Sequence, residues 1–437
     1  MYWGRAKEFL EERGFNVWDY VEVSTERQVF RGVIMPRTQL GDDQHLVIKL
    51  DNGYNIGVRI SRIKEMKLIK REKKKRLKKE EKKYGKTIHE TGGGYVSIVG
   101  TGGTIASKID YETGAVKPSF KVSDILKRIP ELREISEIKA EEIMNIPSED
   151  MEPRNWVKIG EKVIQEIEGG AEGVVIAHGT DTMSYTSAAL SFMIQDLNDP
   201  VVLVGSQRSS DRPSSDSDLN LMSSVRVAKT DLAEVAVVMH GSISDDFCLI
   251  HRGTRVRKMH TSRRDAFKTI NDSPIGIVTE KGEVKFLSNY KKRSDSRGET
   301  WLDKEMEERV SLFKVHPGVS PEFLDFLVDK QRGIVIEGTG MGHVPKGLLD
   351  PLKRALDSGI AVVMTSQCIH GRVNMNVYSR GRELLKMGVI PGEDMIPEVA
   401  MVKLMYVLGK TEDLGEVRKL MLTNMRGEIG KRSPINA

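Results

Sequence analysis

The chain has 437 residues, of which 39% are hydrophobic and 30% are charged, so it is long enough for two or three domains with apolar cores. Its two cysteines, Cys248 and Cys368, are too few for a disulfide framework or a zinc cluster, which favours a reducing compartment. The first residues lack the apolar segment of a signal peptide, and no run approaches roughly 18 apolar residues. These features predict a cytoplasmic protein without a membrane partner.

The positive charge of the chain is concentrated in one segment. Residues 64–83 carry 12 Lys/Arg and 4 Glu, a net charge of +8, so the other 417 residues sum to −3 against the overall +5. Apolar residues are sparse over residues 64–90, which predicts a solvated helix that ends near Gly85. Two interpretations stay open for this segment: a contact with nucleic acid, or a charged linker without a binding role.

The first part of the chain, residues 1–68, is predicted to form a small β-barrel of the SH3-like kind. A short helix is expected over residues 5–13. Four strands should follow, and Asp51-Asn52-Gly53 between the last two is a strong hairpin signal. Their expected ranges are 17–24, 28–36, 45–50 and 54–60. Residues 69–92 are then predicted to form a basic helical linker.

From residue 93 onward, short apolar segments alternate with helical ones, which is typical of an α/β fold with a mainly parallel sheet. Two α/β units are expected, a catalytic one over residues 93–300 and a second over residues 301–437. Strands are expected at 95–100, 173–179, 201–206, 234–241, 274–280, 333–338 and 361–366, and helices at 155–168, 182–197, 346–358 and 397–408.

A glycine-rich turn after the first of these α/β strands is one candidate site. The strand at 95–100 is followed by Thr101, Gly102 and Gly103. Glycines let the backbone turn sharply and bring N–H groups close to a ligand. A hydroxyl here would lie at the carboxyl end of a parallel strand. A nucleophile, an anion-binding nest and an ordinary strand-to-helix turn all remain open, whereas a P-loop and a complete dinucleotide fingerprint are excluded by the residues that follow.

Polar residues also gather after the next strand and in two other segments. Thr180 and Asp181 are expected at the start of a helix, where hydroxyl and carboxylate side chains are favoured by the exposed N–H groups. Two roles therefore remain open for Thr180 and Asp181: capping the helix, or taking part in catalysis. Ser148 and Glu149 form a polar turn. Lys258 lies in a charged segment, where a surface lysine is the simpler interpretation.

Several motifs, taken in order, resemble the type I/II L-asparaginase family. They are TGGTIA, HGTDTM, VGSQRSSDRPSSDSDLN, RKMHTSRRDAF, EGTGMGHVP, TSQCIHGRVN and GVIPGEDMIPEVAMVKLMYVLG. The resemblance covers about three quarters of the chain, from residue 94 to 435, and implies two α/β units of the L-asparaginase type. The barrel and basic linker in front of them resemble the D-subunit family of archaeal glutamyl-tRNA(Gln) amidotransferases.

The resemblance implies catalytic roles for four residues. Thr101 matches the family's acylated nucleophile, and Thr180, Asp181 and Lys258 match a second threonine–aspartate–lysine group. A threonine hydroxyl needs a base to attack near neutral pH, and a neutral lysine amine can take up its proton. Which threonine attacks first, and the protonation state of Lys258, stay open.

The resemblance also implies residues that bind the substrate. Ser148 and Glu149 match positions that hold the α-carboxylate and α-amino groups of the amino acid. Tyr111 matches the tyrosine of a loop that covers the site. Met341 stands where family members often have an asparagine that reaches a neighbouring subunit, so that contact is in doubt here.

Backbone groups are expected to complete the site. The N–H groups around Gly102, Gly103 and Gly179 are predicted oxyanion donors. The histidines lack metal-binding spacing, so no protein metal site is expected. His178 and His240 each end an apolar strand, and structural hydrogen bonds are expected for both.

The resemblance implies an amidase (glutaminase) subunit that hydrolyses glutamine or asparagine and delivers ammonia to a partner subunit. The partner would bind tRNA and would activate the glutamyl group of Glu-tRNA(Gln) with ATP and Mg²⁺, because this chain has no phosphate-binding motif and no cofactor of its own is expected. Self-association into a dimer is expected. Two alternatives remain: a free-standing L-asparaginase with an N-terminal barrel, and a nucleic-acid-binding module on an inactive amidase scaffold.

Overall fold

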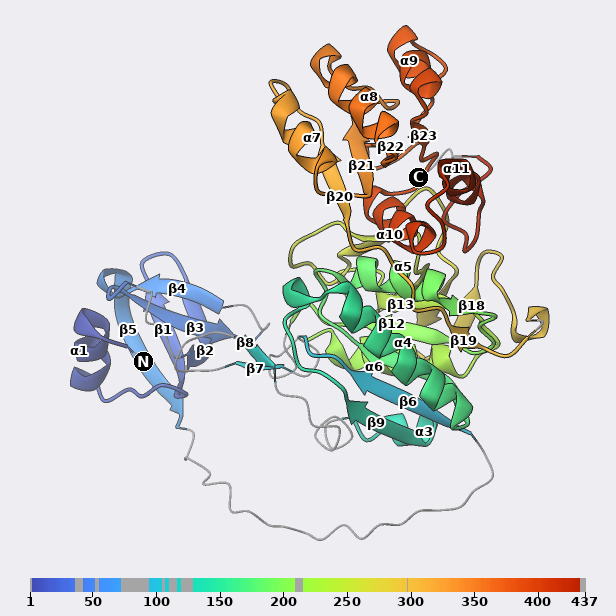
Figure 1. Cartoon of the computed structure of the whole chain (residues 1–437). Coiled ribbons are helices and arrows are strands. Elements are labelled where there is room, and N and C mark those ends of the chain that lie inside the picture. The colour runs from blue at the N-terminus through green and yellow to red at the C-terminus, as the bar shows by residue number, and fades with distance from the viewer. Residues whose placement is uncertain are drawn as a thin grey trace. The chain divides into compact units, whose positions relative to one another are not determined.

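The computed structural model describes residues 2–35, 42–51, 55–71, 94–103, 107–109, 116–118, 129–208, 215–296 and 298–432. The chain divides into two compact units, whose elements are labelled in Figure 1. The first unit holds residues 1–93 with the segments 107–119 and 208–215. The second holds residues 94–106, 120–207 and 216–437.

The first unit is built on a five-stranded antiparallel sheet with the order β4-β3-β2-β1-β5. Alternate residues of the strands, such as Val21 and Val23, are buried and form a core with Phe9 and Leu10 of the preceding helix. Its elements are α1 (Gly4–Glu12), β1 (Tyr20–Thr25), β2 (Val29–Met35), β3 (His45–Leu50), β4 (Asn55–Arg59) and β5 (Ile63–Lys70). The predicted helix and four strands are confirmed, while Asn52 and Gly53 lie outside the described residues. A two-stranded sheet of β7 (Ser107–Ile109) and β8 (Val116–Pro118) also belongs to this unit.

The prediction of a helix from residue 64 is wrong for the part of the segment that is described. Residues 63–70 form β5, which pairs antiparallel with β1. Most of its side chains are exposed, but Ile63 and Met66 pack against the core of the unit. The backbone N–H and C=O groups of β1 need hydrogen-bond partners, and β5 supplies them. This pairing determines the conformation of the segment despite its polar composition. Residues 72–93 lie outside the described part of the chain.

The second unit begins with an eight-stranded sheet of order β18-β17-β14-β13-β12-β10-β6-β9. The five strands from β13 to β9 run parallel, and the three from β14 to β18 join them antiparallel. The strands are β6 (Tyr95–Gly100), β9 (Ile138–Glu142), β10 (Ala171–Ala177), β12 (Val201–Val204), β13 (Val235–His240), β14 (Phe247–Arg252), β17 (Gly276–Thr279) and β18 (Val284–Phe286). The predicted mainly parallel sheet is confirmed, although the strand expected near 274–280 is antiparallel.

Helices cover both faces of this sheet. Val175 and Ala177 of β10 pack in one core with Leu221 of α6, whereas Val174 and Ile176 pack in another with residues of α4 and α5. This alternation is the period of two that a strand buried on both faces requires. The helices are α3 (Leu132–Ile135), α4 (Pro153–Glu168), α5 (Met183–Met193) and α6 (Ser217–Ala228).

The rest of the second unit is a smaller parallel sheet of order β20-β21-β22-β23. Its strands are β20 (Val310–Lys314), β21 (Gly333–Gly338), β22 (Ala361–Ser366) and β23 (Ile390–Pro391), and its helices are α7 (Pro321–Val328), α8 (Leu349–Asp357), α9 (Ser379–Met387), α10 (Pro397–Leu408) and α11 (Leu414–Leu422). Helix α10 packs on α5, so Phe192 and Val399 share one core with Val335 of β21. Figure 1 shows α10 between the smaller sheet and α5. Within the described residues, no helix has the length and hydrophobicity needed to span a bilayer.

Candidate functional site

Thr101 follows β6 at the carboxyl edge of the larger sheet. Its N–H and its Oγ1 both donate to the carbonyl oxygen of Ala177, the last residue of β10, at 3.0 Å each. Its own carbonyl accepts from the N–H of Ile146 at 3.2 Å. The side chain is 1% exposed. The hydroxyl is therefore held at a defined position between the ends of two neighbouring parallel strands.

The two glycines after Thr101 are required by close backbone contacts. Gly102 and Gly103 have φ angles of +112° and +85°, in the region that favours glycine. A Cβ atom on Gly102 would lie 2.4 Å from the carbonyl oxygen of Ile146, and one on Gly103 would lie 2.5 Å from the nitrogen of Gly179. Two of the predicted oxyanion donors, Gly103 and Gly179, are thus in direct contact.

Lys258 ends β15 (Val256–Lys258), which pairs with β16 (Phe267–Thr269). Its Nζ donates to Thr180 Oγ1 at 2.8 Å and to Asp181 Oδ1 at 2.7 Å. The lysine side chain is 12% exposed, whereas that of Asp181 is 67% exposed. The interpretation of Lys258 as an ordinary surface lysine is therefore wrong, and the predicted threonine–aspartate–lysine group is assembled.

The interpretation of Thr180 or Asp181 as a helix cap is also wrong. Helix α5 begins at Met183, and its N-cap residue is Thr182. The Thr182 hydroxyl does not cap the helix but donates to the carbonyl oxygen of Ser148 at 2.7 Å. The side chains of Thr180 and Asp181 accept hydrogen bonds from the amine of Lys258 instead.

Two of the predicted substrate-binding residues, Ser148 and Glu149, lie on the short 3-10 turn Ser148–Asp150. Ser148 is 4% exposed, and its Cβ lies 2.6 Å from the position that a Cβ atom on Gly179 would take. Glu149 is exposed beside it. Tyr111 lies outside the described residues. The structure therefore brings Ser148 to the loop that carries Thr180, with Glu149 adjacent in the chain.

A buried chain of hydrogen bonds behind the site was only partly predicted. Trp156 Nε1 donates to Thr186 Oγ1 at 3.1 Å, and Thr186 Oγ1 lies 2.9 Å from His178 Nε2. His178 Nδ1 lies 2.6 Å from the carbonyl oxygen of Gly179. A carbonyl can only accept, so Nδ1 carries the proton and Nε2 accepts from the Thr186 hydroxyl. Burial lowers the pKa of His178 to about 4, which keeps the ring neutral near pH 7.

This chain of bonds holds the peptide group between Gly179 and Thr180 and so fixes the backbone that presents Thr180 to Lys258. The expected structural hydrogen bonds of His178 are confirmed. Those of His240 are confirmed as well, because its ring nitrogens lie 2.6 Å from Asn220 Oδ1 and 3.0 Å from Asp245 Oδ1. Thr186 was missed, although it lies one helical turn after Thr182, a spacing that places both residues on one face of α5.

The arrangement offers the parts that acyl transfer from an amide requires. A hydroxyl stands at a strand end, backbone N–H groups lie nearby, and an amine is hydrogen-bonded to a second hydroxyl. Among the described residues, no group of three or more His, Cys, Asp or Glu side chains is arranged to hold a metal ion.

Three family models match successive parts of the chain. The GatD N-terminal domain matches residues 15–69, the N-terminal domain of asparaginase matches residues 95–292, and the glutaminase/asparaginase C-terminal domain matches residues 309–421. Among solved structures, the L-asparaginase from Thermococcus kodakarensis is similar with a TM-score of 0.70 and 37% identity, over 77% of this chain and 99% of that one.

Full-length relatives carry the same arrangement of domains. The D subunit of the glutamyl-tRNA(Gln) amidotransferase from Pyrococcus horikoshii is 55% identical over 431 residues, which cover 97% of each chain. Its counterpart from Methanopyrus kandleri is 52% identical over 98% of this chain and 94% of that one. By its length, its three matched domains and its identity to these relatives, the chain belongs to the family of glutamyl-tRNA(Gln) amidotransferase D subunits, whose body is asparaginase-like.

Proposed function

We propose that the chain is an amidase that hydrolyses the side-chain amide of glutamine or asparagine and supplies the ammonia to a partner subunit, which converts Glu-tRNA(Gln) into Gln-tRNA(Gln). The observation that carries this proposal is the position of Lys258 Nζ, within hydrogen-bond distance of both Thr180 and Asp181. Membership of the amidotransferase D-subunit family supports the transfer of ammonia to a partner.

Thr101 is the proposed nucleophile of the first half-reaction. Its Oγ1 attacks the amide carbonyl carbon, and the N–H groups of Gly103 and Gly179 stabilise the negative charge on the carbonyl oxygen. At rest the Thr101 proton points to the Ala177 carbonyl, which is not a base. Attack therefore requires this proton to pass toward the Thr180–Lys258 pair, which returns a proton to the departing ammonia.

Water completes the reaction in the second half. It attacks the acyl group on Thr101, and the Thr180–Lys258 pair takes up its proton in the same way. Asp181 holds the amine of Lys258 in place and carries a negative charge that suits the ammonium group of an amino-acid substrate. We assign the α-carboxylate and α-amino contacts to Ser148 and Glu149, because they lie on the turn that contacts Gly179.

ATP and Mg²⁺ are assigned to the partner subunit, and so is the main contact with tRNA. Activation of the glutamyl group consumes ATP, and the sequence of this chain contains no Walker-type phosphate-binding motif. A homodimer of this chain is part of the proposal, by its resemblance to asparaginases.

The test reconstitutes ammonia transfer with the partner subunit, Glu-tRNA(Gln), ATP and Mg²⁺. With glutamine as the nitrogen donor, the unaltered chain should support formation of Gln-tRNA(Gln), and Thr101→Val should reduce it to background. Free ammonium chloride should restore product formation with Thr101→Val, because the partner then needs no amidase. Failure of ammonium to rescue this variant would mean that Thr101 has a structural role instead.

The same assay separates the alternatives. Full amidation of tRNA by this chain without the partner would contradict the proposal. Rapid asparagine hydrolysis that neither the partner nor tRNA changes would identify a free-standing asparaginase, an outcome motivated by the similarity to the Thermococcus kodakarensis enzyme. Salt-sensitive tRNA binding without any hydrolysis would identify a nucleic-acid-binding module.

A further inference from the structure

A cavity of about 580 Å³ lies at the edge of the larger sheet opposite the candidate site. It is lined by Val235 at the start of β13, by Arg252 at the end of β14 and by the segment that follows α5. Thr101 and Thr180 follow the carboxyl ends of β6 and β10, so a strand of about 20 Å separates the cavity from them. Residues 424–427, which follow α11, close its other side.

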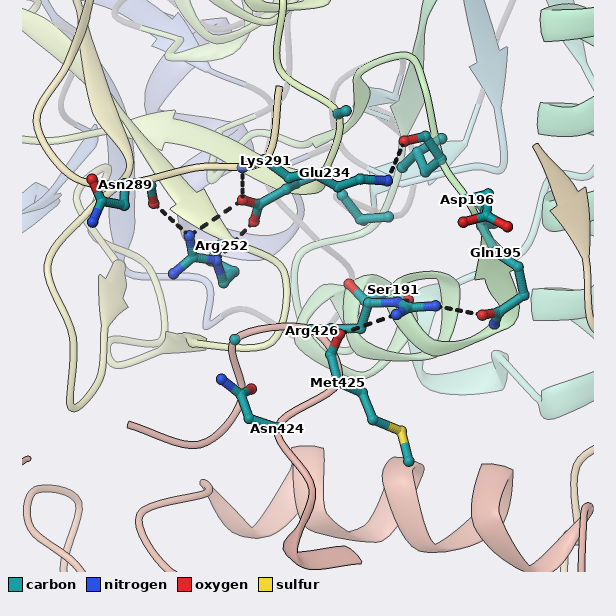
Figure 2. A pocket seen from close by; sticks show the side chains of 15 residues that line it. Ser191, Gln195, Asp196, Glu234, Arg252, Asn289, Lys291, Asn424, Met425 and Arg426 are labelled. Carbon is teal, nitrogen blue, oxygen red and sulfur yellow. Dashed lines mark hydrogen bonds and ion pairs between the residues drawn. The ribbon is translucent and has the colours of Figure 1, made fainter. Parts of the chain in front are cut away.

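Two cations in the cavity wall contact no carboxylate in the described part of the chain. Lys291 Nζ donates to the carbonyl oxygen of Leu197 at 2.7 Å. Arg426 donates to the carbonyl oxygens of Ser191 and Met425 and to Gln195 Oε1. Figure 2 shows both cations and the contact between Arg426 and Gln195. An ammonium has three N–H groups and a guanidinium has five, so each cation keeps two that can still donate.

The wall holds two carboxylates, Asp196 and Glu234, against three cations, Arg252, Lys291 and Arg426. The carboxylate of Glu234 already has two partners. Its Oε2 accepts from Arg252 Nε at 2.7 Å, and its Oε1 accepts from the backbone N–H of Lys291 at 2.7 Å. Arg252 is further paired with Asp272 at 3.0 Å. Burial, and then the charge of Arg426, lowers the pKa of Lys291 even though Asp196 and Glu234 act in the opposite direction.

Two carboxamides add neutral donors to the same wall. Asn289 and Asn424 both line the cavity, and both are labelled in Figure 2. With three cations and these carboxamides against two carboxylates, the wall keeps a net positive charge and more donors than acceptors, and such a donor set matches an oxyanion.

We propose that this cavity is a binding site for a small oxyanion, either a carboxylate or a phosphate, which Lys291 and Arg426 hold between them and which is distinct from the amide substrate. A bound anion offsets the net positive charge of the wall and accepts from N–H groups of Lys291 and Arg426 that have no other partner in the described part of the chain. The volume admits a molecule of the size of a small metabolite, and the strand-length separation from Thr101 excludes the reacting amide as its occupant.

Isothermal titration calorimetry on the full chain tests the proposal, with inorganic phosphate and succinate as separate probes at constant ionic strength in sodium chloride. At least one probe should bind saturably with one site per chain. Lys291→Met and Asn424→Asp should each weaken that binding at least tenfold. Asn424→Asp is isosteric and keeps the oxygen that accepts from the N–H of Ile429, so it serves if Lys291→Met fails to fold.

The matched control is Lys292→Met. Lys292 follows Lys291 in the chain but is not part of the cavity wall. Its Nζ lies 5.6 Å from the centre of the Tyr290 ring instead. This variant should bind the probe within about twofold of the unaltered chain, since a charge change outside the cavity is screened.

Three results would overturn the proposal. The first is that neither probe binds saturably. The second is that Asn424→Asp binds the probe as tightly as the unaltered chain. The third is that binding is lost in Lys258→Met but retained in Lys291→Met. The last result would place the anion at the candidate amidase site. Preference for phosphate or for succinate identifies the class of oxyanion.

Discussion

The mainly parallel larger sheet and the parallel smaller sheet of the second unit each hold a buried threonine hydroxyl at the carboxyl end of a strand. Thr101 Oγ1 donates to Ala177 O on the neighbouring strand at 3.0 Å, and Thr365 Oγ1 donates to Ile336 O on the neighbouring strand at 2.8 Å. Both residues are 1% exposed. Burial and hydrogen bonding are therefore nearly the same for a proposed nucleophile and for a residue of the smaller sheet.

The difference lies in what surrounds each hydroxyl. After Thr365, the side chain of Gln367 donates to the carbonyl oxygens of Val315 and Glu337 and occupies the strand end. After Thr101, two glycines leave the strand end without side chains. The hydroxyl's own hydrogen bond therefore does not distinguish the two threonines, whereas the residues that follow each of them do.

The largest expected effect separates these two threonines directly. Thr101→Val should lower kcat/KM for glutamine hydrolysis by at least about 10⁴-fold, because it removes the proposed nucleophile. Thr365→Val removes an equivalent hydrogen bond and should cost about 1 kcal/mol of unfolding free energy while activity stays within about threefold. Steady-state kinetics and denaturant titration of both variants measure this. Comparable losses of activity in Thr101→Val and Thr365→Val would contradict the proposed difference between the two threonines.

Two lysine–carboxylate pairs extend the comparison to the amine. Lys403 Nζ donates to Glu428 Oε1 at 2.6 Å and to two backbone carbonyls, and both side chains are fully buried. Its three N–H groups are thus all used, so it is a structural amine. Lys258, in contrast, is 12% exposed and bonded to the Thr180 hydroxyl.

Exchange of each lysine for methionine should therefore give opposite results. Lys258→Met should reduce kcat about 10³-fold with unfolding free energy changed by less than about 1 kcal/mol, because Asp181 remains solvated. Lys403→Met should destabilise the fold by about 3–5 kcal/mol, because it leaves the Glu428 carboxylate buried without its cation. Its folded fraction should keep normal kcat. Loss of stability in Lys258→Met with retained kcat would contradict the assignment.

Acid should weaken the larger sheet through two buried histidines. Burial lowers the pKa of His178 to about 4 and that of His251 to about 3. Both are neutral when folded, whereas the unfolded chain takes up protons below about pH 6.5. Their stabilisation is therefore complete above pH 6.5 and is lost as the pH falls, by about 2 kcal/mol for each histidine at pH 5.

Denaturant titration at pH 7 and pH 5 measures this loss. The variant His178→Gln does not titrate, so it should show a smaller difference between the two pH values, by about 2 kcal/mol. An unchanged difference would mean that His178 is not buried as described.

The smallest expected effect on kcat comes from Thr186, which lies behind the candidate site. Thr186→Val removes the hydroxyl between Trp156 and His178 and should cost about 1–3 kcal/mol. It should also lower kcat about tenfold, because the peptide before Thr180 is no longer held in place. Thr186→Ser keeps the hydroxyl and should recover most of the lost rate. Failure of serine to rescue would assign the effect to packing.

Elements with strong patterns of their own were predictable from the sequence. The strand His45–Leu50 and the helix Pro397–Leu408 match their expected ranges because each has a continuous apolar face to bury. Strand β5 was not predicted, since its side chains are charged and its conformation is determined by pairing with β1. Strand β9 was missed for a related reason: it is a largely exposed edge strand beside β6.

The candidate site was predictable as a set of residues but not as a geometry. The motifs name Thr101, Thr180, Asp181 and Lys258, yet no local pattern places Lys258, which lies 77 residues after Asp181, on the Thr180 hydroxyl. Nor does composition reveal the hydrogen bonds that join Trp156, Thr186 and His178. These contacts depend on how α4, α5 and β10 pack, which is a tertiary property.

The most direct test of the account is to trap the acyl-enzyme by rapid acid quench during turnover of glutamine and to locate it by peptide mass spectrometry. We expect a glutamyl group on the peptide that contains Thr101, absent in Thr101→Val and present in Thr365→Val. A glutamyl group on Thr180 instead, with Thr101 unmodified at every quench time, would contradict it.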